Sequence, residues 1–337
     1  GLGDVYKRQA LVPLNDDRMQ AKFVAQRIRD LIEEGTDPNE IAVLYRAHFH
    51  SMELQMELTR GEIPFRITSG IRFFEQAHIK DVVAFMRFVV NPRDELSFRR
   101  MVMLLPGIGP GMAQKLWIRW AACPESRLET PPESFSALML DFPVPAKSKT
   151  AWTQLCYTLD ELAPAGKIAG PASMLISINE AVYDEYMQAA FENYDQRRQD
   201  LLHLAGFSER FESTEDFLSQ LSLLGNTDDE SAAADLSGGA VTLSTIHQAK
   251  GLEWSVVFLI GLCDGMFPHQ RVIDDGDLAG LEEERRLFYV GITRAKDQLY
   301  LTYPRWNCRA QGGTFMQMPS RFLDEFPASL VEEWAVE

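Results

Sequence analysis

The sequence predicts an α/β fold in which a largely parallel sheet is interrupted by an all-helical insertion. Three observations support this prediction. Helix-like and strand-like segments alternate at the start of the chain, the middle has amphipathic helices without a strand-like run, and apolar strands return after residue 240. The 337 residues, 46% of them hydrophobic, are enough for two domains with separate cores.

The first part of the chain alternates between the two patterns. Apolar residues at helical spacing predict a helix over 16–34, which Gly35 ends, and the apolar run IAVLYR predicts a buried strand at 41–46. A second helix is expected at 50–60 and a short strand, FRIT, at 65–68. Residues 1–9 have neither an initiator Met nor an apolar signal core, so we interpret them as a truncated or foreign leader outside the fold.

The middle of the chain predicts a separate helical body. Residues 79–219 contain amphipathic helices broken by Pro-rich loops, and the polar, acidic stretch 226–239 is typical of a linker. Strands are expected again at 241–246, 256–262 and 298–303, and we predict that they share one sheet with the strand at 41–46. The expected domains are a discontinuous sheet domain, residues 10–90 and 237–337, and an inserted helical subdomain, residues 91–236.

Composition excludes several classes of protein. No apolar stretch approaches the roughly 20 residues that a membrane span needs. The four cysteines are scattered without a CxxC pair, which favours a reducing, cytoplasmic location and disfavours zinc sites and disulfides.

The net charge of −16 disfavours a protein coated with nucleic acid, because neutralisation of phosphates drives such binding. A local track remains possible, since the window 96–124 has no Asp or Glu. It contains four cations, Arg99, Arg100, Lys115 and Arg119, which we expect to lie near one surface.

The same window holds a glycine-rich turn, GIGPG, that opens a helix. Gly107 and Gly109 would expose backbone N–H groups and the positive helix end, which suits a duplex phosphate. A tight turn between two packed helices is an equally good interpretation.

The densest motif is TIHQAKGLEW, residues 245–254, between two expected strands. A loop that leaves a strand edge in an open α/β sheet is where ligands bind. This loop offers a hydroxyl, an imidazole, a lysine, a glycine and a carboxylate, although each alone is typical of a solvated turn.

A second dense motif is EEERRLFYVGITRAK, residues 282–296, which predicts a helix leading into a strand. Arg294 at the helix-to-strand turn is well placed to meet a phosphate from another domain, because a guanidinium forks onto phosphate oxygens. Arg285 and Arg286 could instead simply pair with Glu282 and Glu283.

Together these stretches resemble motifs V and VI of the UvrD/PcrA/Rep group of superfamily 1 DNA helicases. IAVLYRAHFHSMELQMEL resembles motif IV, and FFEQAHIKDVVAFMRFVVNP, residues 73–92, resembles the motif that follows it. The similarity runs from about Ile41 to Pro304. It implies a RecA-like parallel-sheet domain of the P-loop NTPase type, without the half that holds the P-loop, interrupted by an all-α insertion.

The resemblance also implies roles for individual residues. The implied nucleotide contacts are Tyr45 on the base, Glu253 on the ribose, and Arg46 and Arg294 on the terminal phosphate, with Arg294 as an arginine finger. The implied DNA contacts are Thr245 and His247 for the single strand, and Gly107, Gly109, Lys115 and Arg119 for the duplex. We expect the four nucleotide-site residues to converge on one exposed edge of the sheet domain.

The sequence departs from the family pattern in motif IV. Ala47, His48 and Phe49 follow Arg46 where a small polar residue or Asn is usual, and Met52 stands where a second basic residue often sits. The contact with DNA or with another domain that this second basic residue would make is therefore not expected in this chain. Trp254 replaces the more usual Phe after KGLE.

The sequence contains no GxxxxGK[ST] and no apolar strand ending in DE. In the family these two elements belong to an N-terminal RecA-like ATPase domain, where they bind the ATP phosphates and Mg²⁺. The isolated chain is therefore expected not to hydrolyse ATP. The implied protein is an ATP-dependent 3′–5′ DNA helicase that acts on single-stranded and duplex DNA in repair or replication. The alternatives are the helicase portion of a RecB/AddA-like helicase–nuclease and a non-catalytic DNA-binding module.

Overall fold

The computed structural model describes residues 9–68, 73–127, 129–225, 239–309, 313–325 and 331–335. The chain divides into two compact units. The sheet unit comprises Gly1–Phe73 and Asn226–Glu337, and the helical unit comprises Phe74–Gly225.

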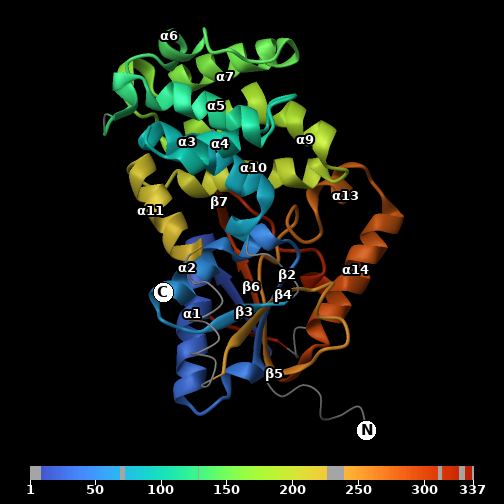
Figure 1. Cartoon of the computed structure of the whole chain (residues 1–337). Helices are drawn as coiled ribbons and strands as arrows, with labels where there is room; N and C mark the ends of the chain where they lie inside the picture. The colour runs from blue at the N-terminus through green and yellow to red at the C-terminus, as the bar shows by residue number, and fades with distance from the viewer. Residues whose placement is uncertain are drawn as a thin grey trace. The chain divides into compact units, whose positions relative to one another are not determined.

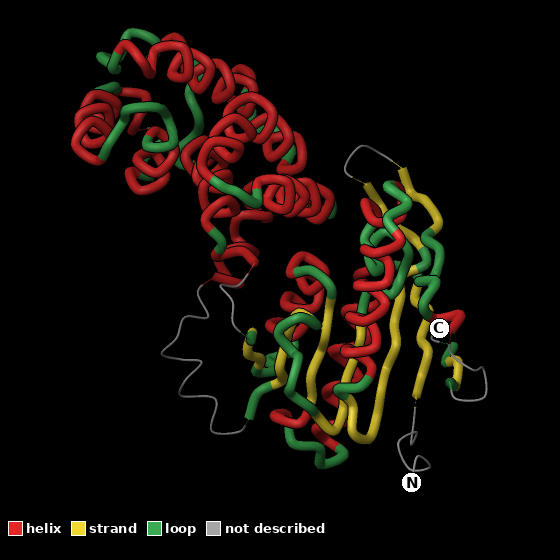
Figure 2. Tube along the Cα trace, turned by 90° about the vertical axis from the view of Figure 1, so that its right-hand side faces the viewer, coloured by secondary structure: helices red, strands yellow, loops and turns green. Residues whose placement is uncertain are grey.

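The sheet unit is built on one parallel sheet of seven strands in the order β3-β4-β2-β5-β6-β1-β9. Its strands are β1 (Gln9–Leu14), β2 (Ile41–Tyr45), β3 (Phe65–Ile67), β4 (Val241–Thr245), β5 (Trp254–Leu259), β6 (Ala295–Pro304) and β9 (Glu332–Glu333). A two-stranded antiparallel sheet, β7 (Trp306–Arg309) with β8 (Gly313–Met316), follows β6. Figure 2 shows the parallel strands as yellow segments running side by side.

Helices cover both faces of this sheet, as buried parallel strands require. The α-helices among the described residues of the unit are α1 (Asp17–Glu33), α2 (Met52–Arg60), α13 (Gln270–Asp274) and α14 (Leu278–Ile292). The strands lie between α1 on one side and α14 on the other (Figure 1). All five residues of β2 are buried, because apolar side chains from both faces surround it.

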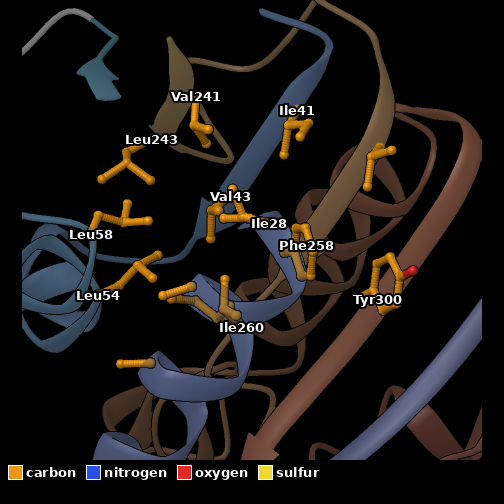
Figure 3. Close-up of a cluster of buried hydrophobic side chains, with 14 of the residues drawn as sticks. Ile28, Ile41, Val43, Leu54, Leu58, Val241, Leu243, Phe258, Ile260 and Tyr300 are labelled. Carbon is orange, nitrogen blue, oxygen red and sulfur yellow. The ribbon is translucent and has the colours of Figure 1, made fainter. Parts of the chain in front are cut away.

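Two apolar clusters form the core, one on each face. The first joins Ile28 of α1 and Leu54 and Leu58 of α2 to β2 and β5 (Figure 3). The second joins Leu287 and Phe288 of α14 to the opposite face. At about 25 cal/mol per Å² of apolar surface removed from water, each fully buried Leu or Phe stabilises the fold by about 1.5–3 kcal/mol.

Local sequence explains where the first helix begins and ends. The Asp16 carboxylate accepts a hydrogen bond from the Met19 N–H at 2.8 Å and so caps α1. Gly35 follows the helix with φ +97°, a left-handed conformation that glycine adopts without strain.

The helical unit has no strand among its described residues, which are all of 74–225 except residue 128. Its helices are α3 (Ala77–Val90), α4 (Glu95–Val102), α5 (Pro110–Ala121), α6 (Phe135–Met139), α7 (Lys149–Leu162), α8 (Pro171–Ile178), α9 (Asp184–Ala190), α10 (Tyr194–Ser208) and α11 (Thr214–Gly225). A π-helical turn, Asn179–Tyr183, joins α8 to α9. Its core is aromatic: the Phe88 ring lies 5.2–5.6 Å from those of Phe98, Trp120 and Phe135.

The predicted fold class is confirmed, and the four strands expected to share a sheet do so as β2, β4, β5 and β6. The first boundary differs from the expected one at residue 90. Helix α3 belongs to the helical unit because its buried face packs against α4, α7, α8 and α11. Gln9, assigned to the leader, is the first residue of β1; residues 1–8 and the expected linker up to residue 238 lie outside the described residues.

Candidate functional site

The parallel sheet has two edges of different chemistry. We call the edge where its strands end the carboxyl edge, and the edge where they begin the amino edge. Arg46 and His247 follow β2 and β4 at the carboxyl edge, whereas Glu253 and Arg294 precede β5 and β6 at the amino edge. Each edge therefore holds one part of the expected site.

At the amino edge, Arg294 ties the segment after α14 to the loop before β5. Its Nη1 donates to the Leu252 carbonyl at 2.9 Å, and its own carbonyl accepts from the Trp254 N–H at 2.9 Å. Its Nε donates to the Val290 carbonyl at 3.0 Å, and Nη2 donates to Thr293 Oγ1 at 3.0 Å. The three side-chain contacts fix the guanidinium, and the backbone contact joins the end of α14 to β5.

All the acceptors of the Arg294 side chain are neutral. Within the described part of the chain, no carboxylate lies within ion-pair distance of this guanidinium. Its positive charge is thus oriented but not neutralised, which is the arrangement that a phosphate-binding arginine requires.

The surroundings of Arg294 are exposed. The neighbouring Glu253 carboxylate makes no hydrogen bond or ion pair with a described residue. Leu252 is 43% exposed and Tyr289 is 66% exposed, although both are large apolar or aromatic side chains. Such exposure around an uncompensated charge suits a site that another domain completes.

At the carboxyl edge, Arg46 is held by Glu284 of α14. Its Nε lies 3.0 and 3.1 Å from the two carboxylate oxygens, and its Nη2 lies 2.7 Å from Oε1. The Glu284 side chain is 7% exposed and that of Arg46 is 25% exposed. A forked pair of this kind is strong and fixes the orientation of both groups.

The charges of this ion pair affect the pKa values of two histidines. Partial burial lowers the pKa of His247, and the Arg46 charge lowers it further, against the opposite effect of Glu284 and Glu283. Burial and Arg46 likewise lower the pKa of His269, which lies between β5 and α13. We call Arg46, Glu284, His247 and His269 the strand-end cluster.

The expectation that Tyr45, Arg46, Glu253 and Arg294 converge on one edge is wrong. Strands β2, β5 and β6 are parallel, with Leu44 opposite Leu259 and Trp254 opposite Ala295. Arg46 is therefore level with Gly261, and Glu253 and Arg294 lie about 26 Å away along the strands, at about 3.3 Å per residue. Glu253 and Arg294 are brought together; Arg46 is not with them, and its guanidinium already has a carboxylate partner.

Tyr45 is also not where the expected role requires it. Its ring is fully buried in the apolar core beneath α1 and α2. The last residue of β2 points inward because side chains alternate along a strand, so no face of the ring is open to a base. Burial raises the pKa of Tyr45 to about 12, with a smaller opposite effect from Ser51.

The expected single-strand contacts differ in accessibility. His247 is exposed, whereas Thr245 is buried at the end of β4. The Thr245 carbonyl accepts from the Gln248 and Ala249 N–H groups, both at 3.1 Å, so its backbone shapes the start of the loop. His247 is the residue of this pair that can meet a ligand directly.

In the helical unit, the glycine-rich turn is exposed at the start of α5. Gly107 has φ +78°, a left-handed conformation that favours glycine, and a Cβ there would lie 1.9 Å from Lys147 Cε, so the lysine side chain would have to move. Gly109 caps α5 without a side chain, and Ser148 Oγ donates to the Pro106 carbonyl. The loop before α7 thus holds the turn and brings Lys147 beside it.

The four cations of the acid-free window do not share one role. Lys115 and Arg119 are exposed on α5, and the Arg119 guanidinium lies 5.9 Å from the Phe142 ring centre. Arg99 pairs with Glu95 at 3.4 Å. Arg100 Nε lies 2.7 Å from Oδ1 of the buried Asp81, which also accepts from the Tyr183 hydroxyl at 2.7 Å. Arg100 is thus a structural residue rather than a member of an open track.

Sequence reasoning missed three residues of these sites, Glu284, Lys147 and His269, and His269 lay outside every motif. Glu284 appeared only as one of three consecutive acids in the second motif, and nothing in the sequence pairs it with Arg46, 238 positions away. Lys147 lay in a Pro-rich loop without any signal. Both contacts depend on long-range packing.

No group of three or more His, Cys, Asp or Glu side chains that could hold a metal ion occurs among the residues with described placement. Cys123, Cys156 and Cys263 are free thiols. None of the described helices combines the length and apolarity needed to cross a membrane.

Comparison with known proteins agrees with this geometry. The chain is 32% identical over 334 residues to DNA helicase II of Escherichia coli strain K12, covering 93% of this chain and 44% of that protein. It is 34% identical over 327 residues to the ATP-dependent DNA helicase PcrA of Bacillus subtilis strain 168, covering 93% and 43%. It is 32% identical over 350 residues to the ATP-dependent DNA helicase UvrD1 of Mycobacterium tuberculosis strain H37Rv, covering 94% and 43%.

The chain thus spans less than half the length of these relatives. The family model for the UvrD-like helicase C-terminal domain matches residues 10–123 and 181–305, which include both edges of the sheet and the glycine-rich turn. The parallel sheet with its helical insertion and the two motifs on its edges therefore have one explanation: the chain belongs to the UvrD-like helicase C-terminal domain family.

Proposed function

We propose that this chain is the C-terminal part of an ATP-dependent DNA helicase that translocates 3′–5′ on single-stranded DNA and unwinds duplexes in DNA repair or replication. In this proposal it supplies one half of the ATP site and part of the DNA-binding surface. The observation that carries the proposal is the guanidinium of Arg294, which is held by neutral acceptors and has no carboxylate partner in the described parts of the chain.

The residues at the amino edge fit a nucleotide. Glu253 offers an exposed carboxylate that can accept hydrogen bonds from ribose hydroxyls, and Arg294 offers a charged donor for the terminal phosphate. When bound, ATP with Mg²⁺ supplies the phosphoryl group and its counter-ion, and the N-terminal RecA-like domain holds both. Arg294 stabilises the negative charge that develops as the phosphoryl group transfers.

The DNA-binding residues lie elsewhere. His247 at the carboxyl edge is proposed to contact single-stranded DNA, with the Thr245 backbone shaping its loop. Gly107, Gly109, Lys115 and Arg119 are proposed to contact the duplex, together with Lys147. Exposed backbone N–H groups at a glycine turn and flexible cations bind phosphates without regard to sequence.

The experiment is ATP turnover by the full-length protein with saturating single-stranded DNA. Arg294→Ala should lower turnover by a factor on the order of 10³, as loss of an arginine finger does, while the Kd for ATP changes far less. The matched control is Arg60→Ala, which removes a half-exposed arginine that pairs with Glu57 at 3.1 Å on α2.

Near-normal turnover by Arg294→Ala would refute the proposal. The isolated 337-residue chain should show no DNA-stimulated ATPase, because its sequence has no phosphate-binding loop. Mixing it with the N-terminal part should restore activity only if the two halves form one site.

A further inference from the structure

The Glu284 carboxylate has an unusual place for a charged group. It is almost completely buried, and both of its oxygens lie within hydrogen-bond distance of Arg46 Nε. Burying a charge is costly unless it is paired and hydrogen-bonded, so Arg46 is what permits Glu284 to be there. The pair joins the carboxyl end of β2 to the first half of α14.

Arg46 retains binding capacity beyond this pair. Glu284 occupies Nε and one side of Nη2, and Nη1 makes no hydrogen bond with a described residue. The side chain is a quarter exposed. A guanidinium has five N–H donors in a fixed fork, so an incoming phosphate oxygen can bind the remaining donors while the hydrogen bonds between Arg46 and Glu284 stay intact.

Helix α14 connects this pair to Arg294. Glu284 precedes the end of the helix at Ile292 by about 12 Å along the axis, at 1.5 Å per residue, and Arg294 follows two residues later. The helix is closely seated: a Cβ on Gly291 would lie 3.3 Å from Leu259 Cδ1 and 3.5 Å from Ile246 Cγ2. A displacement of Glu284 therefore moves the helix end rather than being absorbed by loose packing.

A second segment makes the same connection. The loop after β4 begins beside the strand-end cluster at His247, and it ends at Leu252, whose carbonyl accepts from Arg294 Nη1 at 2.9 Å. Helix α14 and this loop thus both run from the carboxyl edge to the amino edge and meet at Arg294.

We propose that Glu284 is a positioning residue that, through Arg46 and α14, couples a phosphate bound at the carboxyl edge to the placement of Arg294 at the amino edge. Phosphate binding polarises and reorients the Arg46 fork, Glu284 follows it, and α14 carries the shift to Arg294. This inference rests on the proposed function, since it concerns how DNA stimulates turnover at Arg294.

The test measures ATP turnover by the full-length protein with and without saturating oligothymidylate, together with the Kd for that oligonucleotide. Glu284→Gln should lower the ratio of stimulated to unstimulated turnover by about tenfold, within the 5–150-fold range of typical coupling, with a smaller change in the Kd. The matched control is Glu282→Gln, which removes an exposed carboxylate on the same helix that pairs with Arg285.

Two further variants keep the test decisive. Exchanging the charges with Arg46→Glu and Glu284→Arg together restores the ion pair but removes the phosphate donor at residue 46, so the ratio should stay low even where stability recovers; a recovered ratio would mark a merely structural role. If Glu284→Gln does not fold, Arg46→Lys answers the question, because lysine keeps the charge but cannot fork onto both oxygens. The ratio of stimulated to unstimulated turnover should also fall in Arg46→Lys.

An unchanged ratio in Glu284→Gln or in Arg46→Lys overturns the proposal. So does an equal fall of stimulated and unstimulated turnover, which marks a stability effect. If Arg294→Ala abolishes turnover while Glu284→Gln keeps its ratio, only this inference fails. If Arg294→Ala turns over normally, the proposed function itself fails.

Discussion

Arg46 and Arg294 lie at opposite edges of the same parallel sheet, one directly after β2 and the other directly before β6. Arg46 is forked onto the buried Glu284, whereas Arg294 is bound only by neutral acceptors. The two arginines therefore serve different ligands, and the structure makes separate predictions for the two edges.

The buried Tyr45 leads to a prediction about stability. Its hydroxyl is buried without a well-formed hydrogen bond, so Tyr45→Phe should change the free energy of unfolding by less than about 1 kcal/mol. Tyr45→Ala removes a buried ring from the core and should cost about 3–5 kcal/mol. Urea unfolding monitored by circular dichroism measures both. A large loss in Tyr45→Phe would show that the hydroxyl has a partner.

The two histidines of the strand-end cluster predict a dependence of stability on pH. Their folded pKa values are lowered, so the unfolded chain takes up protons first as the pH falls below about 6.5. The two histidines therefore contribute fully to the free energy of unfolding above about pH 6.5, and this contribution is lost as the pH falls from there through their lowered folded pKa values.

Melting temperatures at pH 7.5 and pH 5.5 test this prediction. The double variant His247→Gln with His269→Gln should lose less stability between these two pH values than the unaltered chain. An equal loss in both proteins would mean that the carboxylates alone account for the acid sensitivity.

The exposed cations of α5 predict a salt effect on duplex binding by the full-length protein. Lys115→Glu with Arg119→Glu should weaken binding and lower the slope of log K against log salt by about 2, because each phosphate contact contributes about 0.9. The matched control is Arg99→Gln, since Arg99 belongs to the same window but pairs with Glu95. A slope that is unchanged in the double variant would assign these residues to helix packing only.

The buried Asp81 predicts which cation of that window is structural. Asp81→Ala leaves Arg100 and the Tyr183 hydroxyl without their carboxylate, so the free energy of unfolding should fall by about 3 kcal/mol. Glu161→Ala, an exposed acid on α7, is the control and should stay within about 0.5 kcal/mol. Comparable losses in the two variants would contradict the assignment.

Periodicity and composition were sufficient to predict the sheet strands β2 to β6 and the helical character of the insertion. Strand β1 was missed because Pro13 and the adjoining leader masked a short apolar run, and pairing with β6 is what stabilises it. The place of α3 was missed for a related reason. Its apolar residues predict a buried helix but do not identify the core that buries it.

The candidate site, like the fold, was predicted from the sequence only in part. The family resemblance predicted that Glu253 and Arg294 come together, and the structure brings them to one edge because each directly precedes a neighbouring strand. The resemblance misplaced Arg46, because in a parallel sheet a residue that follows β2 lies at the opposite edge from residues that precede β5 and β6. The ion pair with Glu284 depends on how α14 lies on the sheet, which local sequence does not encode.

The strand order also dictates when the sheet can form during synthesis. Strands β1, β2 and β3 precede the helical unit in the sequence, yet none of them is a neighbour of another in the sheet. Strand β2 pairs only with β4 and β5, and β1 needs β6, all of which are translated after residue 240. Strands β1, β2 and β3 therefore emerge from the ribosome before their partners, and they wait while the 152 residues of 74–225 are made. Unpaired apolar strands are prone to aggregate, so the nascent chain is most vulnerable before β4, β5 and β6 appear, and chaperone binding at that stage would protect the sheet.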